Sequence, residues 1–238
     1  MTEAAAGMGK GTAPKPRGLR DSPFFRVGDF NVHKWQVFTI AGTLTLGSSI
    51  CHTKGMETRK LQIIRFTESL IQQKGYAAFS YDDLAKHFGV TKASIHYHFE
   101  KKEDLGLAVL ERLYQRLLAF SARMAISQEP VEEKLARFSK LQMEELADDV
   151  ICPISSLQAD FELLPDSMRM KLQAISRLEL SVMQGIIADG ASGLGTDSRA
   201  VALAVLAAIK GSLQYRRVLG EDPGPDIMDG ICRILTRS

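Results

Sequence analysis

The sequence has few cysteines and few aromatic residues for a chain of 238 residues. Its three cysteines, Cys51, Cys152 and Cys232, are too scattered for a disulfide framework or a zinc site. CxxC and HExxH strings are absent, as are a glycine-rich phosphate loop and a nucleophile elbow. We therefore expect no bound metal, no cofactor and no catalytic residue, and reduced thiols in a cytoplasmic protein.

Long apolar runs and strand-like patterns are also missing. The stretch WQVFTIAGTLTLGSSIC at 35–51 is shorter than the roughly 20 apolar residues of a membrane-spanning helix, and Thr and Ser interrupt it. No sustained alternation of apolar and polar residues is bounded by turn signals, which argues against a sheet. Many Ala, Leu, Met, Glu and Lys residues favour helices instead. These features predict an all-α protein without a membrane partner.

The charge is small overall but unevenly distributed along the chain. The formal net charge is +2, with 18 Lys and Arg against 11 Asp and Glu in residues 1–126, and 12 against 17 in residues 127–238. A basic half followed by an acidic half fits a nucleic-acid-binding module joined to a module of another kind. Four of the basic residues lie in the first 20, so the asymmetry alone does not assign a function.

The most informative stretch is SYDDLAKHFGVTKASIHYHFEKKED, at 80–104. Ser80 and Asp83 have the spacing of a capping box that opens a helix. Gly89 stands where a helix end favours a residue tolerant of positive φ, and Thr91 is a second N-cap. The following segment, 92–99, is rich in hydrogen-bonding side chains. Two short helices joined by a glycine-containing turn are typical of a helix-turn-helix.

The run GVTKASIHYHFEKKEDL resembles the signature of the TetR family of transcriptional regulators. The positions that match the family pattern are Gly89, Val90, Thr91, Ala93, Ser94, Ile95, His98, Phe99, Lys102, Glu103 and Leu105. His96 departs from it, because the family usually has tyrosine there. The resemblance implies an N-terminal three-helix DNA-binding domain followed by a helical ligand-binding and dimerisation domain.

Helical periodicity and breakers suggest how the chain is divided. We expect a disordered N-terminal extension at 1–55, a TetR-type helix-turn-helix domain at 56–103, and a helical ligand-binding and dimerisation domain at 104–238. Gly75 should end the first helix. The expected helices outside 80–104 span 56–74, 105–126, 131–147, 166–188, 197–219 and 226–235, with a further helix bracketed by Pro153 and Pro165.

Eight residues are candidates for contact with double-stranded DNA. Lys92 and Lys102 suit phosphates, and the helix N-termini at Ser80 and Thr91 supply backbone amides. The remaining four lie on the expected recognition helix and suit base edges or phosphates: Ser94, His96, Tyr97 and His98. An exposed side chain without a DNA contact is the alternative for each of these.

A small-molecule effector pocket is implied only by the resemblance. The candidate lining residues are Tyr114, Phe138, Met143, Cys152, Phe161 and Met183, for which plain core packing is the alternative. The segment VICPISSLQADFELLP resembles a stretch of the electrophile- and quinone-responsive repressors, which place a reactive cysteine near Cys152. A buried, inert thiol is the alternative there.

The helix AVALAVLAAIKGSL, at 200–213, is apolar on nearly every side and so requires burial on several sides. It could form the centre of one subunit, but the resemblance implies a homodimer interface. The function predicted is a homodimeric repressor released from a palindromic operator by a small molecule. The alternatives are a TetR-fold interaction module without operator binding, or an electrophile or redox sensor acting through Cys152. An enzyme is the competing class, which the missing catalytic motifs disfavour.

Overall fold

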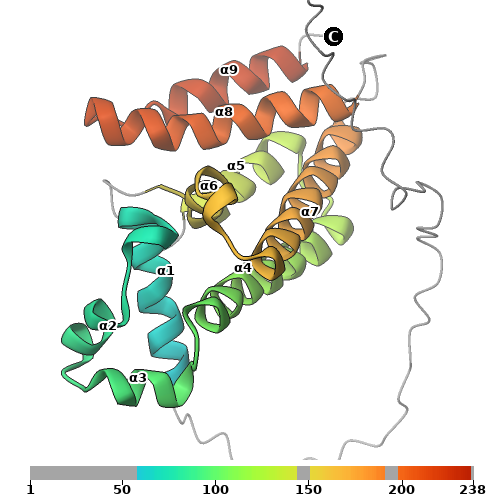
Figure 1. Cartoon of the computed structure of the whole chain (residues 1–238). Helices are drawn as coiled ribbons and strands as arrows, with labels where there is room; N and C mark the ends of the chain where they lie inside the picture. Colours follow the sequence, from blue (N-terminus) through green and yellow to red (C-terminus); the bar gives the residue numbers. More distant parts are fainter. Residues whose placement is uncertain (1–57, 144–150, 191–197, 237–238) are drawn as a thin grey trace, which may run out of the picture. The chain divides into compact units, whose positions relative to one another are not determined.

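The computed structural model describes residues 58–143, 151–190 and 198–236, all within one compact unit, Thr53–Ser238. No strand occurs in these ranges, which confirms the all-α prediction. The helices are α1 (Arg59–Ala78), α2 (Tyr81–Phe88), α3 (Lys92–His98), α4 (Lys102–Ile126), α5 (Val131–Met143), α6 (Pro153–Ala159), the 3-10 helix η1 (Phe161–Leu163), α7 (Asp166–Gly190), α8 (Ser198–Leu219) and α9 (Gly224–Thr236) (Figure 1).

Most helix boundaries lie close to the predicted ones. Gly75 has φ 83° and ψ 168°, so it breaks the helical backbone of α1 as expected, although helical turns resume as far as Ala78. The helix α4 begins three residues earlier than predicted, because the Asp104 carboxylate accepts the Lys101 backbone N–H at 3.0 Å and so caps its first turn. Three predicted features lie outside the described residues: the disordered extension at 1–55, the end of the helix 131–147 and the first residue of the helix 197–219.

The first three helices form a small bundle around one apolar cluster. The side chains of Ile63, Leu84, Ile95 and Phe99 are all buried at its centre. They come from α1, α2, α3 and the residue after α3, so the bundle closes as the sequence periodicity predicts. We refer to this bundle, Arg59–His98, as the reading head, because the sequence predicts that it contacts DNA.

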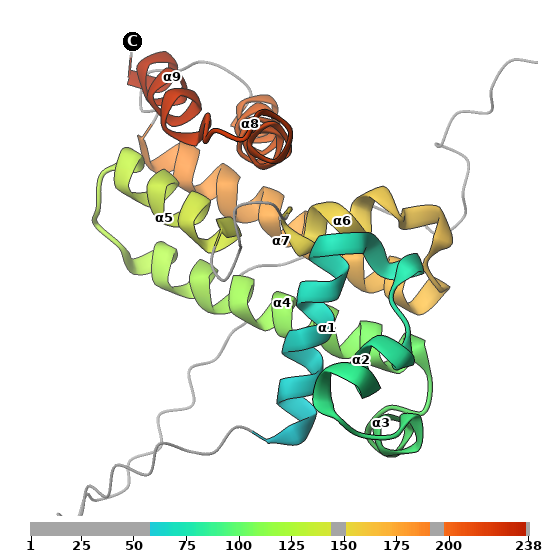
Figure 2. The ribbon, with the colours of Figure 1, turned by 90° about the vertical axis from the view of Figure 1, so that its left-hand side faces the viewer.

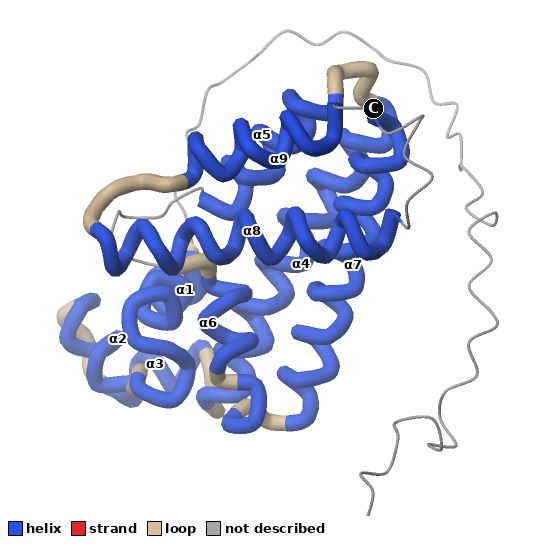
Figure 3. The backbone as a smooth tube through the Cα atoms, turned by 90° about the horizontal axis from the view of Figure 1, so that it is seen from above, coloured by secondary structure: helices blue, strands red, loops and turns tan. Residues whose placement is uncertain are grey.

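The helices α4 and α7 lie side by side and form the centre of the remaining chain (Figures 1 and 2). Both helices contribute buried apolar side chains to the core, such as Leu110, Met168 and Ile175. The helix α8 packs on α7, and α9 packs on α8 and α5 (Figure 3). None of the helices in the described ranges is long and apolar enough to cross a membrane.

The short helix α6 attaches this central layer to the reading head. Its Ser156 hydroxyl donates to the Ile71 carbonyl at 2.7 Å, and both groups are buried. Asp160, directly after α6, accepts the Tyr76 backbone N–H at 2.7 Å. Since Tyr76 follows the break at Gly75, the α6 contact holds the end of α1 in place.

Candidate nucleic-acid interface

The entrance to α2 is fixed by the predicted capping box. The Ser80 hydroxyl accepts the Asp83 N–H at 3.4 Å, while the Asp83 carboxylate accepts the Ser80 N–H at 2.7 Å. Lys74 lies 2.9 Å from the same carboxylate. Hydrogen bonds from Lys74 and then from Ser80 lower the pKa of Asp83 to about 2. The ion pair between Lys74 of α1 and Asp83 of α2 thus connects these two helices at the surface of the reading head.

Replacing Asp83 with asparagine should remove a pH-dependent part of the stability. Because the folded pKa is lowered, the carboxylate stabilises fully above its ordinary value of roughly 4 and loses this effect as pH falls towards 2. The difference in free energy of unfolding between wild type and Asp83→Asn, measured with urea, should shrink over that window. The control is Asp82→Asn, which removes a neighbouring charge outside the capping box. Equal pH dependence in both variants would contradict the assignment.

The turn between α2 and α3 places the next helix. Gly89 adopts a left-handed conformation, with φ 63° and ψ 35°, and the Val90 N–H donates to the Ala85 carbonyl at 3.0 Å. Thr91 then caps α3 by accepting the Ser94 N–H at 3.3 Å. The predicted helix, turn and helix are therefore all present.

The helix α3 is held to the core on one side and open on the other. Ile95 is only 1% exposed, whereas Lys92, Ser94 and His96 are exposed and Tyr97 is 86% exposed. A tyrosine with so much surface in water is uncommon away from a binding surface, because its ring carries a large apolar area. The exposed side of α3 is the one that could enter a DNA groove.

The two histidines of α3 differ in their surroundings. His96 Nδ1 lies 3.0 Å from the Glu100 carbonyl oxygen, and its ring is 4.5 Å from that of Tyr81. Since a carbonyl oxygen only accepts, His96 Nδ1 is the donor of this hydrogen bond. His98 is half-buried, next to the Tyr97 ring. Burial raises the pKa of Tyr81 to about 12, and its hydroxyl donates to the Phe99 carbonyl.

The two lysines predicted to contact phosphates already have partners within the chain. Lys92 forms an exposed ion pair with Asp82 at 2.7 Å, which is weak enough to exchange for a phosphate. Lys102 is half-buried: its Nζ donates to the Ala77 carbonyl at 3.1 Å and lies over the Tyr76 and Phe79 rings. Burial lowers the pKa of Lys102. Lys102 thus fastens the start of α4 to the end of α1.

The six candidate effector residues are placed in different surroundings. Phe138, Cys152 and Met183 are buried, Tyr114 and Phe161 are half-buried, and the Met143 side chain lies outside the described set. A small cavity of ≈ 20 Å³ lies where α1, α4, α5 and α6 meet, and Cys152 is the candidate that lines it. The lining residues are Glu68, Leu113, Arg116, Leu117, Leu141, Gln142, Cys152, Pro153 and Ile154.

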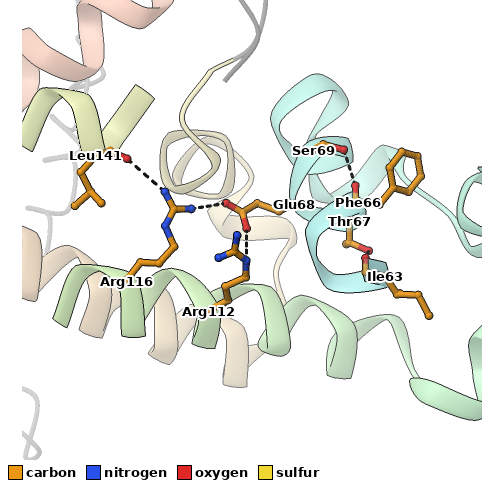
Figure 4. A network of polar contacts seen from close by, with 8 residues as sticks. All are labelled: Ile63, Phe66, Thr67, Glu68, Ser69, Arg112, Arg116 and Leu141. Atoms are coloured by element: carbon orange, nitrogen blue, oxygen red, sulfur yellow. Dashed lines mark hydrogen bonds and ion pairs between the residues drawn. The ribbon is translucent and has the colours of Figure 1, made fainter. Parts of the chain in front are cut away.

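A carboxylate from the reading head lies at this cavity. Glu68 of α1 lies 3.0 Å from Arg116 Nη1 and 3.4 Å from Arg112 Nε, both on α4 (Figure 4). Arg116 also donates to the Leu141 carbonyl of α5 at 3.5 Å. Charged groups with so little exposure are stable only with well-placed partners. These contacts connect the reading head to the helices α4–α9, which the resemblance predicts to bind an effector and which we refer to as the effector half.

A second set of polar contacts continues from the cavity into α7 and α8. Gln142 donates to Glu179 at 3.0 Å, and Lys210 Nζ lies 2.8 Å from the other oxygen of Glu179. The Cys152 thiol donates to the Gln142 carbonyl oxygen at 2.9 Å. Burial raises the pKa of Cys152, which keeps the thiol protonated and therefore a poor nucleophile.

The sequence interpretation missed Glu68, Arg112 and Arg116, although a signal was present. Glu68 falls at helical spacing among Ile64 and Ile71, on the side of α1 that packs inward. The two arginines are four residues apart and so share one face of α4. A glutamate on an apolar face predicts a buried cationic partner. No group of three or more His, Cys, Asp or Glu residues suited to a metal occurs among the described residues.

Comparisons with known proteins agree with this geometry. Residues 63–109 match the model of the family described as bacterial regulatory proteins, tetR family. An uncharacterized HTH-type transcriptional regulator in the lacX 3' region of Lactococcus lactis is 24% identical over 172 residues, which cover 68% of this chain and 85% of that one. The biofilm operon icaADBC negative transcriptional regulator IcaR of Staphylococcus epidermidis is 31% identical over 64 residues, or 27% of this chain and 35% of IcaR.

A solved structure extends the match to the effector half. A TetR transcriptional regulator from Legionella pneumophila superposes with a TM-score of 0.68 at 26% identity, over 76% of this chain and 99% of that one. The capped helix-turn-helix and the helices that follow it define a DNA-binding transcriptional regulator. Residues 63–109 belong to the TetR family of bacterial regulatory proteins, and the fold of the longer chain is similar to that of a TetR regulator.

Proposed function

We propose that the chain is a homodimeric repressor that binds a palindromic operator and is released from it by a small molecule. The observation that carries the proposal is the open side of α3, with Tyr97 86% exposed and Lys92 in an exchangeable surface pair. One recognition helix reads few base pairs, so two copies of the chain would be needed for a specific site.

The outer side of α8 supports the homodimer. Val218 is 82% exposed, and Leu203, Tyr215 and Leu219 are also exposed along the same helix. An apolar helical surface of this kind requires a partner, and Ala204 and Ala207 would allow a second helix to approach closely. Ile234 of α9, the helix that packs on α8, is also 72% exposed. The occupant we propose is the same surface of a second copy.

Release by an effector is supported by the cavity beside Glu68 and Cys152. The cavity lies between helices of the effector half and one helix of the reading head. A molecule that favours one arrangement of these helices would change the spacing of the two recognition helices. Binding of the effector would then lower the affinity for the operator, and binding of the operator would lower the affinity for the effector by the same factor.

Replacing Lys92 with alanine should weaken operator binding and reduce its dependence on salt. Each copy in the homodimer would lose one contact with a phosphate, so the slope of log K against log salt should change by about 1.8, that is about 0.9 for each copy. The measurement is a gel shift with the DNA upstream of the protein's own gene, at several salt concentrations. The matched control is Arg177→Ala, which removes an exposed positive charge from α7 and should leave the slope unchanged.

Two results would contradict the proposal. Equal slopes of log K against log salt for Lys92→Ala and Arg177→Ala would contradict a contact between α3 and the DNA phosphates. If the wild type bound no DNA even at low salt, the fold would be serving as an interaction module instead. Sedimentation of the wild type as a monomer at the concentrations used would contradict the homodimer.

A further inference from the structure

We propose that the effector is a small organic carboxylate that binds Arg112 and Arg116 of α4 in place of Glu68. This inference rests on the proposed function, and it adds the chemical class of the effector and the group that the effector displaces. In the structure as it stands, the Glu68 side chain fills the carboxylate position itself. The reading head thus supplies an internal competitor for the effector.

The two arginines are arranged as a receptor for one carboxylate. They stand on successive turns of α4, and each faces a different oxygen of Glu68, at 3.4 Å and 3.0 Å (Figure 4). The contact with Arg116 is a charge-assisted hydrogen bond and the contact with Arg112 is an ion pair, so two positive charges stabilise one carboxylate. The Glu68 side chain is 5% exposed, while those of Arg112 and Arg116 are 19% and 21% exposed. The arginines therefore have access to solvent that the bound glutamate lacks.

The rest of the cavity suits an apolar tail. Leu113, Leu117, Leu141 and Ile154 supply apolar walls, and the Gln142 amide and the Cys152 thiol add neutral polar groups. A volume of ≈ 20 Å³ has room for about one water molecule, so a larger ligand requires a lining group to move away. Glu68 is the lining group whose departure would also free the arginines. Entry of a carboxylate and displacement of Glu68 would therefore be one event.

Displacement of Glu68 would act directly on the reading head. Glu68 belongs to α1, and its contact with α4 is one of the attachments that fix α1 to the effector half. Further attachments, through Ser156, Asp160 and Lys102, lie nearer the end of α1. Losing the Glu68 contact while keeping these would let α1 turn about its far end. The orientation of α3, which packs on the same core, would change with it.

The test titrates the full-length protein by calorimetry with three carboxylates: acetate, hexanoate and benzoate. Their neutral amides, acetamide, hexanamide and benzamide, serve as matched ligands of nearly the same shape. Wild type should bind at least one carboxylate and none of the amides with comparable affinity. Glu68→Gln keeps the side-chain shape but removes the competing charge, so it should bind the same carboxylate about tenfold more tightly. Arg116→Gln should bind it at least tenfold more weakly.

The matched control is Asp189→Asn. It removes the carboxylate of another ion pair, with Lys134 at 2.7 Å, away from the cavity. Its affinity for the carboxylates should equal that of wild type. Thermal melts identify any variant that does not fold, and the comparison of carboxylate with amide on wild type still decides the case. Binding of neither class, equal binding of both, or no gain in Glu68→Gln would overturn the proposal.

Failure of this inference can be told apart from failure of the proposed function. Operator binding is measured without any carboxylate, so a wild type that shifts DNA but ignores all three carboxylates leaves the repressor intact and rejects the effector class. A wild type that binds a carboxylate but no DNA supports the carboxylate site and rejects the repressor function. Where both are present, the bound carboxylate should weaken the gel shift, and Glu68→Gln should bind the operator less tightly without any ligand.

Discussion

Replacing Lys210 with methionine is expected to lower the free energy of unfolding by about 3 kcal/mol, because it leaves a buried charge without its counter-ion. The Glu179 side chain is 2% exposed, and Lys210 Nζ lies 2.8 Å from one of its oxygens. Gln142 still donates to the other oxygen, which places the loss at the lower end of the usual range. Urea denaturation at a fixed protein concentration measures the change.

The double variant Glu179→Gln, Lys210→Met is the control for that experiment. It removes both charges, and the introduced side-chain amide can still accept the hydrogen bond from Gln142. Replacement of a whole buried pair by neutral groups is often nearly neutral, so most of the stability should return. A double variant as unstable as Lys210→Met would mean that packing, and not the unpaired charge, explains the loss.

Replacing Gly75 with alanine is the second change expected to have a large effect. Its φ of 83° with ψ of 168° lies in a region that is open almost only to glycine, and occupying it costs another residue on the order of 1–3 kcal/mol. A Cβ there would also lie 2.7 Å from the Asp160 carboxylate oxygen that accepts the Tyr76 N–H. Loss of that hydrogen bond adds about 1 kcal/mol. We expect a combined loss of about 3 kcal/mol in urea denaturation.

Gly89→Ala provides the comparison. Gly89 also has a positive φ, 63°, but nothing lies within 4 Å of the position that its Cβ would take. Only the left-handed backbone then opposes alanine, at about 1 kcal/mol. Equal losses in the two variants would contradict the larger loss expected for Gly75→Ala. A second signature of that contact is weaker protection of the Tyr76 amide from hydrogen exchange in Gly75→Ala alone.

Local sequence signals predict the reading head well. The capping box of Ser80 and Asp83, the positive φ of Gly89 and the N-cap at Thr91 are all present as expected. Each depends on residues within four positions of one another, so local hydrogen bonds and local backbone geometry determine them. Gly75 is likewise recognisable as a break. The eight DNA candidates and the six effector candidates stay predictions until binding is measured.

Contacts between distant parts of the chain cannot be predicted from local sequence signals in the same way. Lys102 matches a position of the family signature, but its hydrogen bond to Ala77 and its place over two aromatic rings depend on how α4 meets α1. The pairing of Glu68 with Arg112 and Arg116 joins residues more than 40 positions apart. Periodicity gives the buried side of each helix, but it does not say which helix covers that side.

The attachments of α1 also bear on how such regulators can be recombined. A chimera that joins the operator specificity of one regulator to the inducer response of another could be cut near the start of α4, where the reading head ends. Here the first segment would carry Glu68 and Gly75, and the second would carry their partners Arg112, Arg116 and Asp160. In a recipient without these partners, the Glu68 carboxylate would be buried without a counter-ion. Successful grafts should therefore exchange α1 together with matching residues of α4 and α6.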